Sequence, residues 1–182
     1  LTGLISLGHT GFLLLGAYGY AIAVAKYQYH PLVGFLAAGV VAAGFSVVVG
    51  LPSLRLRGLY LAITTLASSY IIANLILEAR SFTGGARGIM VMRPEMFGID
   101  FGSDQAFALL CLFVAVLALL ACLNIGRSRI GRAFMAIRDN DIAARTMGVS
   151  LSTYKLYAFM ASSFIAGIAG ALLGIYLSFV SV

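Results

Sequence analysis

Charged residues are scarce in this sequence of 182 residues. Asp, Glu, Lys and Arg make up 10% of the chain and hydrophobic residues make up 62%, whereas soluble domains have about a quarter charged and about half apolar residues. No charged residue lies deep within a long apolar stretch. These deficits exclude an ordinary soluble domain and predict a membrane protein that crosses the bilayer several times.

Groups that could carry catalysis or hold a metal are also missing. The histidines His9 and His30 stand apart, and the sequence has no paired carboxylates and no nucleophile–base arrangement. Cys111 and Cys122 lie in one apolar stretch at a spacing typical of neither a metal site nor a disulfide, so we expect both to pack as small apolar residues. The sequence therefore predicts no catalytic residue, no metal site and no cofactor.

The lack of an ionisable side chain at membrane depth bears on transport as well. Carriers driven by protons or by voltage usually need such a group within the membrane. Its absence argues against a carrier of that kind. A sodium-coupled carrier that uses neutral oxygens stays open.

Five apolar stretches account for nearly the whole chain. A helix needs about 20 apolar residues to cross the hydrocarbon layer. The stretches cover Leu4–Ala25, Leu32–Leu54, Leu59–Leu77, Ala106–Ile125 and Tyr154–Val182. The predicted fold is all-α, a single transmembrane domain over residues 1–182 with about five membrane segments. Because neither end has a polar tail, we expect this domain to be incomplete at both ends.

The first stretch is irregular in its first half. Only Phe12–Ala25 is free of polar side chains, and its 14 residues are too few to cross the bilayer alone. Residues 2–12 must complete the span, and their glycines either form a broken helix that lines a cavity or let a neighbouring helix approach closely. In the first case Ser6, His9 and Thr10 would line a translocation path. A lone histidine, however, more often makes a packing hydrogen bond.

Neutral hydrogen-bonding side chains recur along the third stretch, at Thr64, Thr65, Ser68, Ser69, Tyr70 and Asn74. Each one alone is typical of helix packing, but as a group they favour a polar path. The path residues predicted here are Thr64, Thr65, Ser68 and Asn74.

The fifth stretch carries small residues at four-residue spacing, Ala166, Gly170 and Gly174. Such a stripe lets another helix approach closely. We expect it to meet a helix of this subunit or of a partner.

The net charge of +6 lies on one side of the membrane when the five stretches alternate in direction. One side receives eight positive residues, Arg55, Arg57, Arg127, Arg129, Arg132, Arg138, Arg145 and Lys155, against Asp139 and Asp141. The other receives four basic residues balanced by four acidic ones. By the positive-inside rule, residues 126–152 are cytoplasmic and residues 78–105 are external. This distribution fits a membrane topology and argues against nucleic acid as a partner.

The cytoplasmic segment over residues 126–152 is predicted to form two short helices. Ile130, Phe134 and Ile137 share a helical face, but Ile142 falls roughly a third of a turn away from them. Residues 139–141, Asp-Asn-Asp, favour a break between the helices. Gly148 then ends the second helix.

Four segments together resemble the permease subunits of bacterial branched-chain amino acid ABC transporters, most closely the LivM type. They are LISLGHTGFLLLGAY, LRLRGLYLAITTLA, FTGGARGI and GRAFMAIRDNDIAARTMGVSLSTYKLYAFMASSFIAGIAGAL, and they cover most of the chain. The resemblance implies a multi-pass protein of the bacterial plasma (inner) membrane. It also implies a second homologous permease, cytoplasmic ABC ATPases, an extracytoplasmic substrate-binding protein and further spans at both ends.

The resemblance also implies a role for the cytoplasmic segment. Residues 142–148 are similar to the Glu-Ala-Ala-x-x-x-Gly motif on which the ATPase of an importer docks, with Ile142 at the acidic position. The ATPase-coupling residues predicted from it are Arg138, Asp141, Ala143, Ala144, Arg145 and Gly148. The departure at Ile142 removes any ion pair from that position.

Three functions remain open at this point. The first is an ATP-driven importer subunit for branched-chain amino acids, or for related solutes such as amides or urea. A sodium-coupled or facilitative carrier is the alternative, and a membrane scaffold without transport is the third. ATP dependence and a co-purifying ATPase separate the first from the others.

Overall fold

A computed structural model describes residues 6–53, 59–91, 93–96 and 99–181. Its elements in chain order are α1 (His9–Ala21), a π-helix (Ile22–Lys26), α2 (Pro31–Ser53), α3 (Leu59–Glu78), α4 (Arg80–Thr83), a 3-10 turn (Gly85–Arg87), β1 (Ile89–Met90), β2 (Glu95–Met96), β3 (Ile99–Asp100), α5 (Asp104–Arg127), α6 (Arg129–Asp139), α7 (Asp141–Thr146), α8 (Leu151–Leu177) and β4 (Phe179–Val180). The all-α prediction is confirmed, apart from four two-residue strands. Leu4, Leu54, Arg55, Arg57 and Val182, which the sequence predictions used, lie outside the described residues.

Within the described residues, four helices are long and apolar enough to span a membrane: α2, α3, α5 and α8. They correspond to the second to fifth predicted stretches. The first stretch gives a shorter helix, because α1 has 13 residues and continues into the five-residue π-helix. The helix of this span thus begins at His9, in the segment that was predicted to be irregular.

The centre of the fold is a bundle of α1, α2 and α8 that packs through small residues. A Cβ on Gly16 of α1 would lie 2.0 Å from the carbonyl oxygen of Gly167 on α8, and a Cβ on Gly170 would lie 1.9 Å from that of Leu13. On the other side of α8, a Cβ on Gly167 would lie 2.5 Å from the carbonyl oxygen of Ala38 in α2. The small-residue stripe of the fifth stretch therefore meets helices of this same chain.

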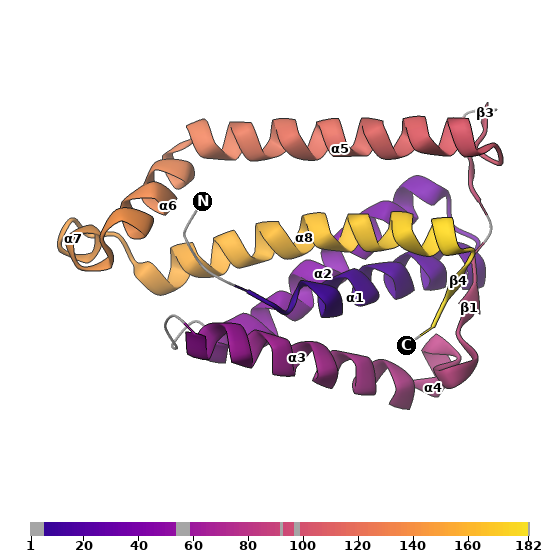
Figure 1. Cartoon of the computed structure of the whole chain (residues 1–182), viewed down its shortest axis with the longest axis horizontal. Coiled ribbons are helices and arrows are strands. Elements are labelled where there is room, and N and C mark those ends of the chain that lie inside the picture. The colour runs from indigo at the N-terminus through magenta and orange to yellow at the C-terminus, as the bar shows by residue number, and fades with distance from the viewer. Residues whose placement is uncertain (1–5, 54–58, 92, 97–98, 182) are drawn as a thin grey trace.

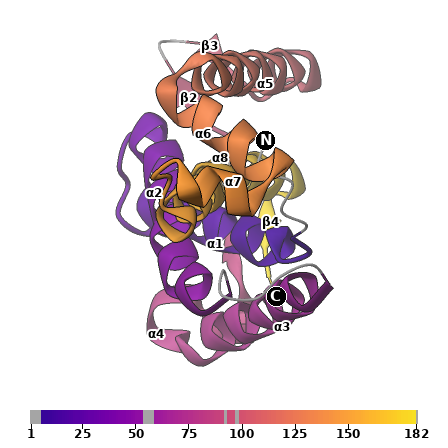
Figure 2. The same cartoon turned by 90° about the vertical axis from the view of Figure 1, so that its left-hand side faces the viewer.

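The helices α3 and α5 lie on opposite sides of that central bundle (Figures 1 and 2). α5 runs beside α8 but apart from it, and its first turns contact the bundle through stacked rings of Phe107 and Tyr176, 6.3 Å apart. Cys111 packs against the core, whereas Cys122 is exposed. The prediction that both cysteines pack is therefore wrong for Cys122, because α5 stands away from the other helices there.

The polar segments gather at opposite ends of the long helices, with α6 and α7 at one end and α4 and the strands at the other (Figure 1). This placement agrees with stretches that alternate in direction. At the strand end, β4 follows α8 and pairs antiparallel with β1, Ile89 opposite Val180. β2 and β3 form a separate antiparallel pair.

Candidate functional site

The predicted coupling loop, residues 126–152, folds as two capped helices. Asn140 is extended at φ −159° and ends α6, and its side-chain oxygen then accepts hydrogen bonds from the backbone N–H groups of Ile142 at 2.9 Å and Ala143 at 3.1 Å. One residue thus stops the first helix and caps the second. The break predicted at residues 139–141 is confirmed.

The first helix of the loop is held against the membrane span that follows it. Phe134 and Ile137 of α6 are buried, and the ring of Phe134 packs edge-on against Tyr154 of α8, with centroids 6.4 Å apart. Ile130, predicted on the same face, is partly exposed. The loop is therefore packed onto α8 by apolar contact over the last turns of α6.

Gly148 ends α7 in the left-handed conformation, with φ +82°. Its N–H donates to the carbonyl of Arg145 and the N–H of Val149 donates to that of Ala144, each at 3.1 Å. These two bonds are the pattern of a Schellman C-cap. No atom lies within 4 Å of a Cβ built on Gly148, so backbone conformation alone calls for glycine here. The prediction for the backbone at Gly148 is confirmed.

The predicted coupling residues divide into an outward and an inward set. Arg138, Ala143 and Arg145 are exposed. Ala144 is only 2% exposed and faces inward, so it holds α7 in place and cannot touch a docked partner. Asp141 is turned toward α8, where it pairs with Lys155 at 2.8 Å.

Sequence reasoning missed two apolar residues at the tip of the loop. Ile142 is 74% exposed and Met147 is 83% exposed, among the most exposed large hydrophobic residues described. The signal for the first was present, because isoleucine stands where the related motif has a glutamate. Lys155 was also missed as a site residue, since its partner lies 14 positions earlier.

The irregular start of α1 packs against α3. The N–H of Leu7 donates to the side-chain oxygen of Thr65 at 3.1 Å, and a Cβ on Gly8 would lie 2.5 Å from the Thr65 carbonyl oxygen. A Cβ on Gly11 would likewise come within 2.9 Å of the Cα of Ser69. Of the two interpretations, the structure favours close helix packing for Gly8 and Gly11. Gly3 lies outside the described residues.

The candidate path residues on α1 make local polar contacts. The ring nitrogen Nε2 of His9 lies 2.7 Å from the hydroxyl oxygen of Ser162 in α8, a packing hydrogen bond between the two helices. Ser6 accepts a bond from the N–H of Gly8 at 3.4 Å. Thr10 is exposed. Ser162 was not predicted, because nothing in the sequence links it to His9.

The path residues on α3 lie on two different faces. Thr65 is fully buried against α1, whereas Asn74 is exposed and Thr64 and Ser68 are half-buried. The side chains of Thr64, Ser68 and Asn74 each donate to a carbonyl one turn earlier, at 2.8, 2.8 and 2.9 Å. The predicted residues therefore do not converge on one path inside the chain.

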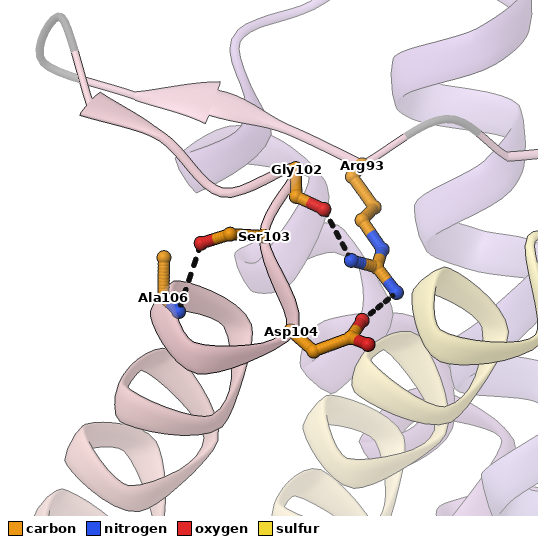
Figure 3. Close-up of polar contacts among 5 residues, drawn as sticks. All are labelled: Arg93, Gly102, Ser103, Asp104 and Ala106. Atoms are coloured by element: carbon orange, nitrogen blue, oxygen red, sulfur yellow. Dashed lines mark hydrogen bonds and ion pairs between the residues drawn. The ribbon is translucent and has the colours of Figure 1, made fainter.

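A cluster around Arg93 fixes the start of α5 at the other end of the molecule (Figure 3). Its guanidinium pairs with Asp104 at 2.7 Å, donates to the carbonyl of Gly102, and lies 5.6 Å from the centre of the Phe107 ring. The side chain of Ser103 caps the first turn of α5. This cluster was not predicted, and it ties the segment after β1 to the first turn of α5.

Comparison with known proteins decides the family. The family described as the branched-chain amino acid transport system permease component matches residues 1–182. The chain belongs to this family. The resemblance seen in the sequence is thereby confirmed, and the protein is an integral membrane permease component.

Its relatives are permeases of the LivM type. The chain is 35% identical to the high-affinity branched-chain amino acid transport system permease protein LivM of Salmonella typhimurium, over all of this chain and 48% of that protein. Identity to LivM of Escherichia coli is 36% over the same shares. A probable branched-chain amino acid permease LivM of Methanocaldococcus jannaschii is 29% identical over 81% of this chain and 45% of its own length.

The chain spans about half the length of these relatives. No solved structure matches it.

Proposed function

We propose that this chain is a transmembrane part of an ATP-driven importer that moves leucine, isoleucine and valine into the cytoplasm across the bacterial plasma membrane. Its partners are a second permease, cytoplasmic ABC ATPases and an extracytoplasmic substrate-binding protein. One observation carries the proposal beyond family membership: the capped two-helix loop at the Arg-rich end of the bundle, with two exposed apolar side chains at its tip. Exposed apolar side chains at the tip of an ordered loop are typical of a surface that binds another protein.

The tip has the features of a docking surface for a protein. Ile142 of α7 and Met147 directly after it are exposed, as are Arg138 and Arg145 of the same loop. Apolar anchors surrounded by basic residues suit a groove with an apolar floor and an acidic rim, because burying the anchors gives affinity and the charges orient the approach. The ATPase is the partner that fits on the cytoplasmic side.

The loop also has a firm mechanical connection to the membrane helices. The Asp141–Lys155 ion pair and the Phe134–Tyr154 contact join α7 and α6 to the start of α8. A displacement of the docked tip is therefore passed to α8. From α8 it reaches α1 and α2 through the backbone contacts of the bundle.

A pair of substitutions at Gly148 tests the coupling role. Valine disfavours the left-handed conformation by about 1–2 kcal/mol, whereas asparagine tolerates it. In the transporter assembled with its partners, we expect Gly148→Val to weaken ATPase association and leucine uptake and Gly148→Asn to leave both near the unmodified level. Equal uptake by both variants would show that the shape of this loop does not couple hydrolysis to transport.

Substitutions at the tip test the docking surface separately. Ile142→Ser and Met147→Glu remove apolar anchors without touching the caps, so each should reduce co-purification of the ATPase while the permease still inserts. Ala144→Glu serves a different purpose, because its buried position makes it a folding variant. Wild-type association of both tip variants would exclude this surface as the ATPase contact.

ATP dependence separates the importer from the carrier alternative. The importer should take up leucine only with ATP, the ATPase and the binding protein present. Uptake of leucine by the purified 182-residue chain alone, without ATP, would support a facilitative or sodium-coupled carrier.

A further inference from the structure

One face of α3 carries hydroxyl and amide side chains among apolar ones. The polar stripe of α3 consists of Tyr60, Thr64, Ala67, Ile71 and Asn74, with Ser68 beside it. We propose that this stripe lines the water-filled path along which the zwitterionic amino acid crosses the membrane, an inference that rests on the importer function proposed above.

The stripe follows a single line along the helix. Its members recur at spacings of four, three, four and three residues, which keeps them within one narrow face at 100° per residue. From Tyr60 to Asn74 the line is about 21 Å long at 1.5 Å per residue, most of the hydrocarbon thickness. The stripe can therefore accompany a solute over most of its passage.

The stripe points away from the rest of the chain. Tyr60 is 72% exposed, and Asn74 and Ala67 are also exposed, whereas the opposite face of α3 buries Leu61, Thr65 and Ile72. The neighbours Thr64 and Thr65 illustrate the division. Thr65 accepts a hydrogen bond from Leu7 before α1, whereas Thr64 donates to Tyr60 of its own helix.

The outer faces of α2 and α5 differ from the outer face of α3, on which polar side chains alternate with exposed apolar ones such as Ile63 and Leu75. On the described surface of α2 the exposed side chains include Leu36, Val40 and Val48, and between 108 and 120 on α5 they include Leu112 and Phe113. Such faces suit acyl chains. A hydroxyl or amide that donates to its own helix still has open acceptor positions, which acyl chains cannot fill, so a row of such groups favours a wet or polar surrounding.

The chemistry of the stripe suits a neutral zwitterion. Thr64, Ser68 and Asn74 each use a donor on their own helix, so their oxygens keep lone pairs that can accept hydrogen bonds from water or from an ammonium group. Ala67 and Ile71 provide apolar contact for an aliphatic side chain. No charged residue lies between Tyr60 and Asn74, so no fixed charge traps the solute.

The interior of the bundle offers no comparable route among the described residues. Its helices meet at backbone distance at Gly16, Gly167 and Gly170, and Thr65 faces the packed start of α1. A path beside α3 needs a second wall, which the homologous permease would supply.

Single cysteines test the stripe in the fully assembled transporter. In a background with Cys111 and Cys122 replaced by alanine, Thr64→Cys, Ser68→Cys and Asn74→Cys are exposed to a hydrophilic methanethiosulfonate reagent. Two control variants accompany them. Thr65→Cys places the thiol on the buried face of α3, and Leu117→Cys places it on the apolar face of α5, about as far from the external end of its helix as Thr64 and Thr65 are from theirs.

Thiolates form readily only where water reaches them, so we expect the stripe cysteines to react at least about tenfold faster than both controls. Leucine should slow this reaction. Size-exclusion chromatography of each assembled variant shows that it has folded. Three stripe positions are tested so that the result does not depend on one damaging substitution.

Two results would overturn the proposal. Stripe cysteines in intact assemblies that react no faster than the controls would show that the stripe packs against protein or lipid. Fast reaction that leucine does not slow would show a wet face that is no substrate path. ATP-driven leucine uptake by the unmodified transporter is measured in parallel, so that a failure of the importer function is seen separately.

Discussion

Gly170→Ala provides the sharpest test of the packing described here, because it adds one methyl group where two helix backbones meet. The new Cβ would lie 1.9 Å from the carbonyl oxygen of Leu13 in α1, whereas ordinary contacts begin at 3.4 Å. The helices would have to separate by 3.4 − 1.9, about 1.5 Å. The obstacle is backbone within a helix, so no flexible side chain can move aside.

The expected loss of stability lies at the upper end of the range for overpacked cores, about 3 kcal/mol. For a domain of this size that corresponds to a fall of roughly 6–12 °C in the unfolding midpoint. The assay is thermal unfolding of the purified subunit in detergent at a fixed heating rate, with loss of monodisperse protein as the readout.

Gly44→Ala is the matched control. Gly44 lies in the middle of α2, and a Cβ built on it meets nothing within 4 Å. Alanine favours helix over glycine by up to about 1 kcal/mol, so this variant should melt at the unmodified temperature or slightly above it. If Gly170→Ala melts together with Gly44→Ala, the close approach of α1 and α8 is wrong, and with it the rigid connection from the loop to the bundle.

Three further predictions concern the ends of the molecule. Lys155→Met leaves the carboxylate of Asp141 half-buried without its partner, so we expect the folded loop to lose about 1–3 kcal/mol of stability. ATPase co-purification should fall as a result, and Lys155→Arg should largely restore it. In a cysteine-free background, Gln105→Cys should react with an impermeant thiol reagent added outside intact cells and Ser150→Cys should not, and the reverse pattern would invert the topology. Arg93→Ala should lower the free energy of unfolding by about 1 kcal/mol or less, since its partner Asp104 is 90% exposed, yet speed amide hydrogen exchange in the first turn of α5; unchanged exchange would show that the pair positions nothing.

Local patterns in the sequence were enough to predict the long helices and the two-helix form of the loop. Hydrophobic length predicted α2, α3, α5 and α8, because each span must be apolar over a fixed distance. The break at residues 139–141 and the stop at Gly148 were also predictable, since capping and left-handed backbone are properties of a few adjacent residues.

Features that depend on distant partners were not predictable. The pairing of β1 with β4 joins two strands of two residues each that lie about 90 positions apart in the sequence. Strands this short leave no periodic signal. The contact of Arg93 with Asp104 and the pairing of Asp141 with Lys155 likewise depend on where loops turn.

The orientation of individual helix faces was the other gap. Periodicity places Thr64 and Thr65 on different faces of α3, but only the position of α1 shows which face is buried. The same holds for Ala144, which the motif assigned to docking and which the fold turns inward. A single sequence gives the angle between two residues around a helix axis, but it does not show on which side the neighbouring helix packs.

The packing of α8 limits how this domain can move. α8 holds the coupling loop at one end through the contact of Tyr154 with Phe134, and β4 joins its other end to β1. Along its length, Gly167 and Gly170 meet α2 and α1 at backbone distance, so sliding α8 past either helix would drive side chains into backbone. A push on the loop would therefore shift α1, α2 and α8 together. Thr65, which accepts a hydrogen bond from Leu7 just before α1, would carry α3 with them. A path on the outer face of α3 would then open and close by movement of this unit against its neighbour, without a gap forming inside the bundle.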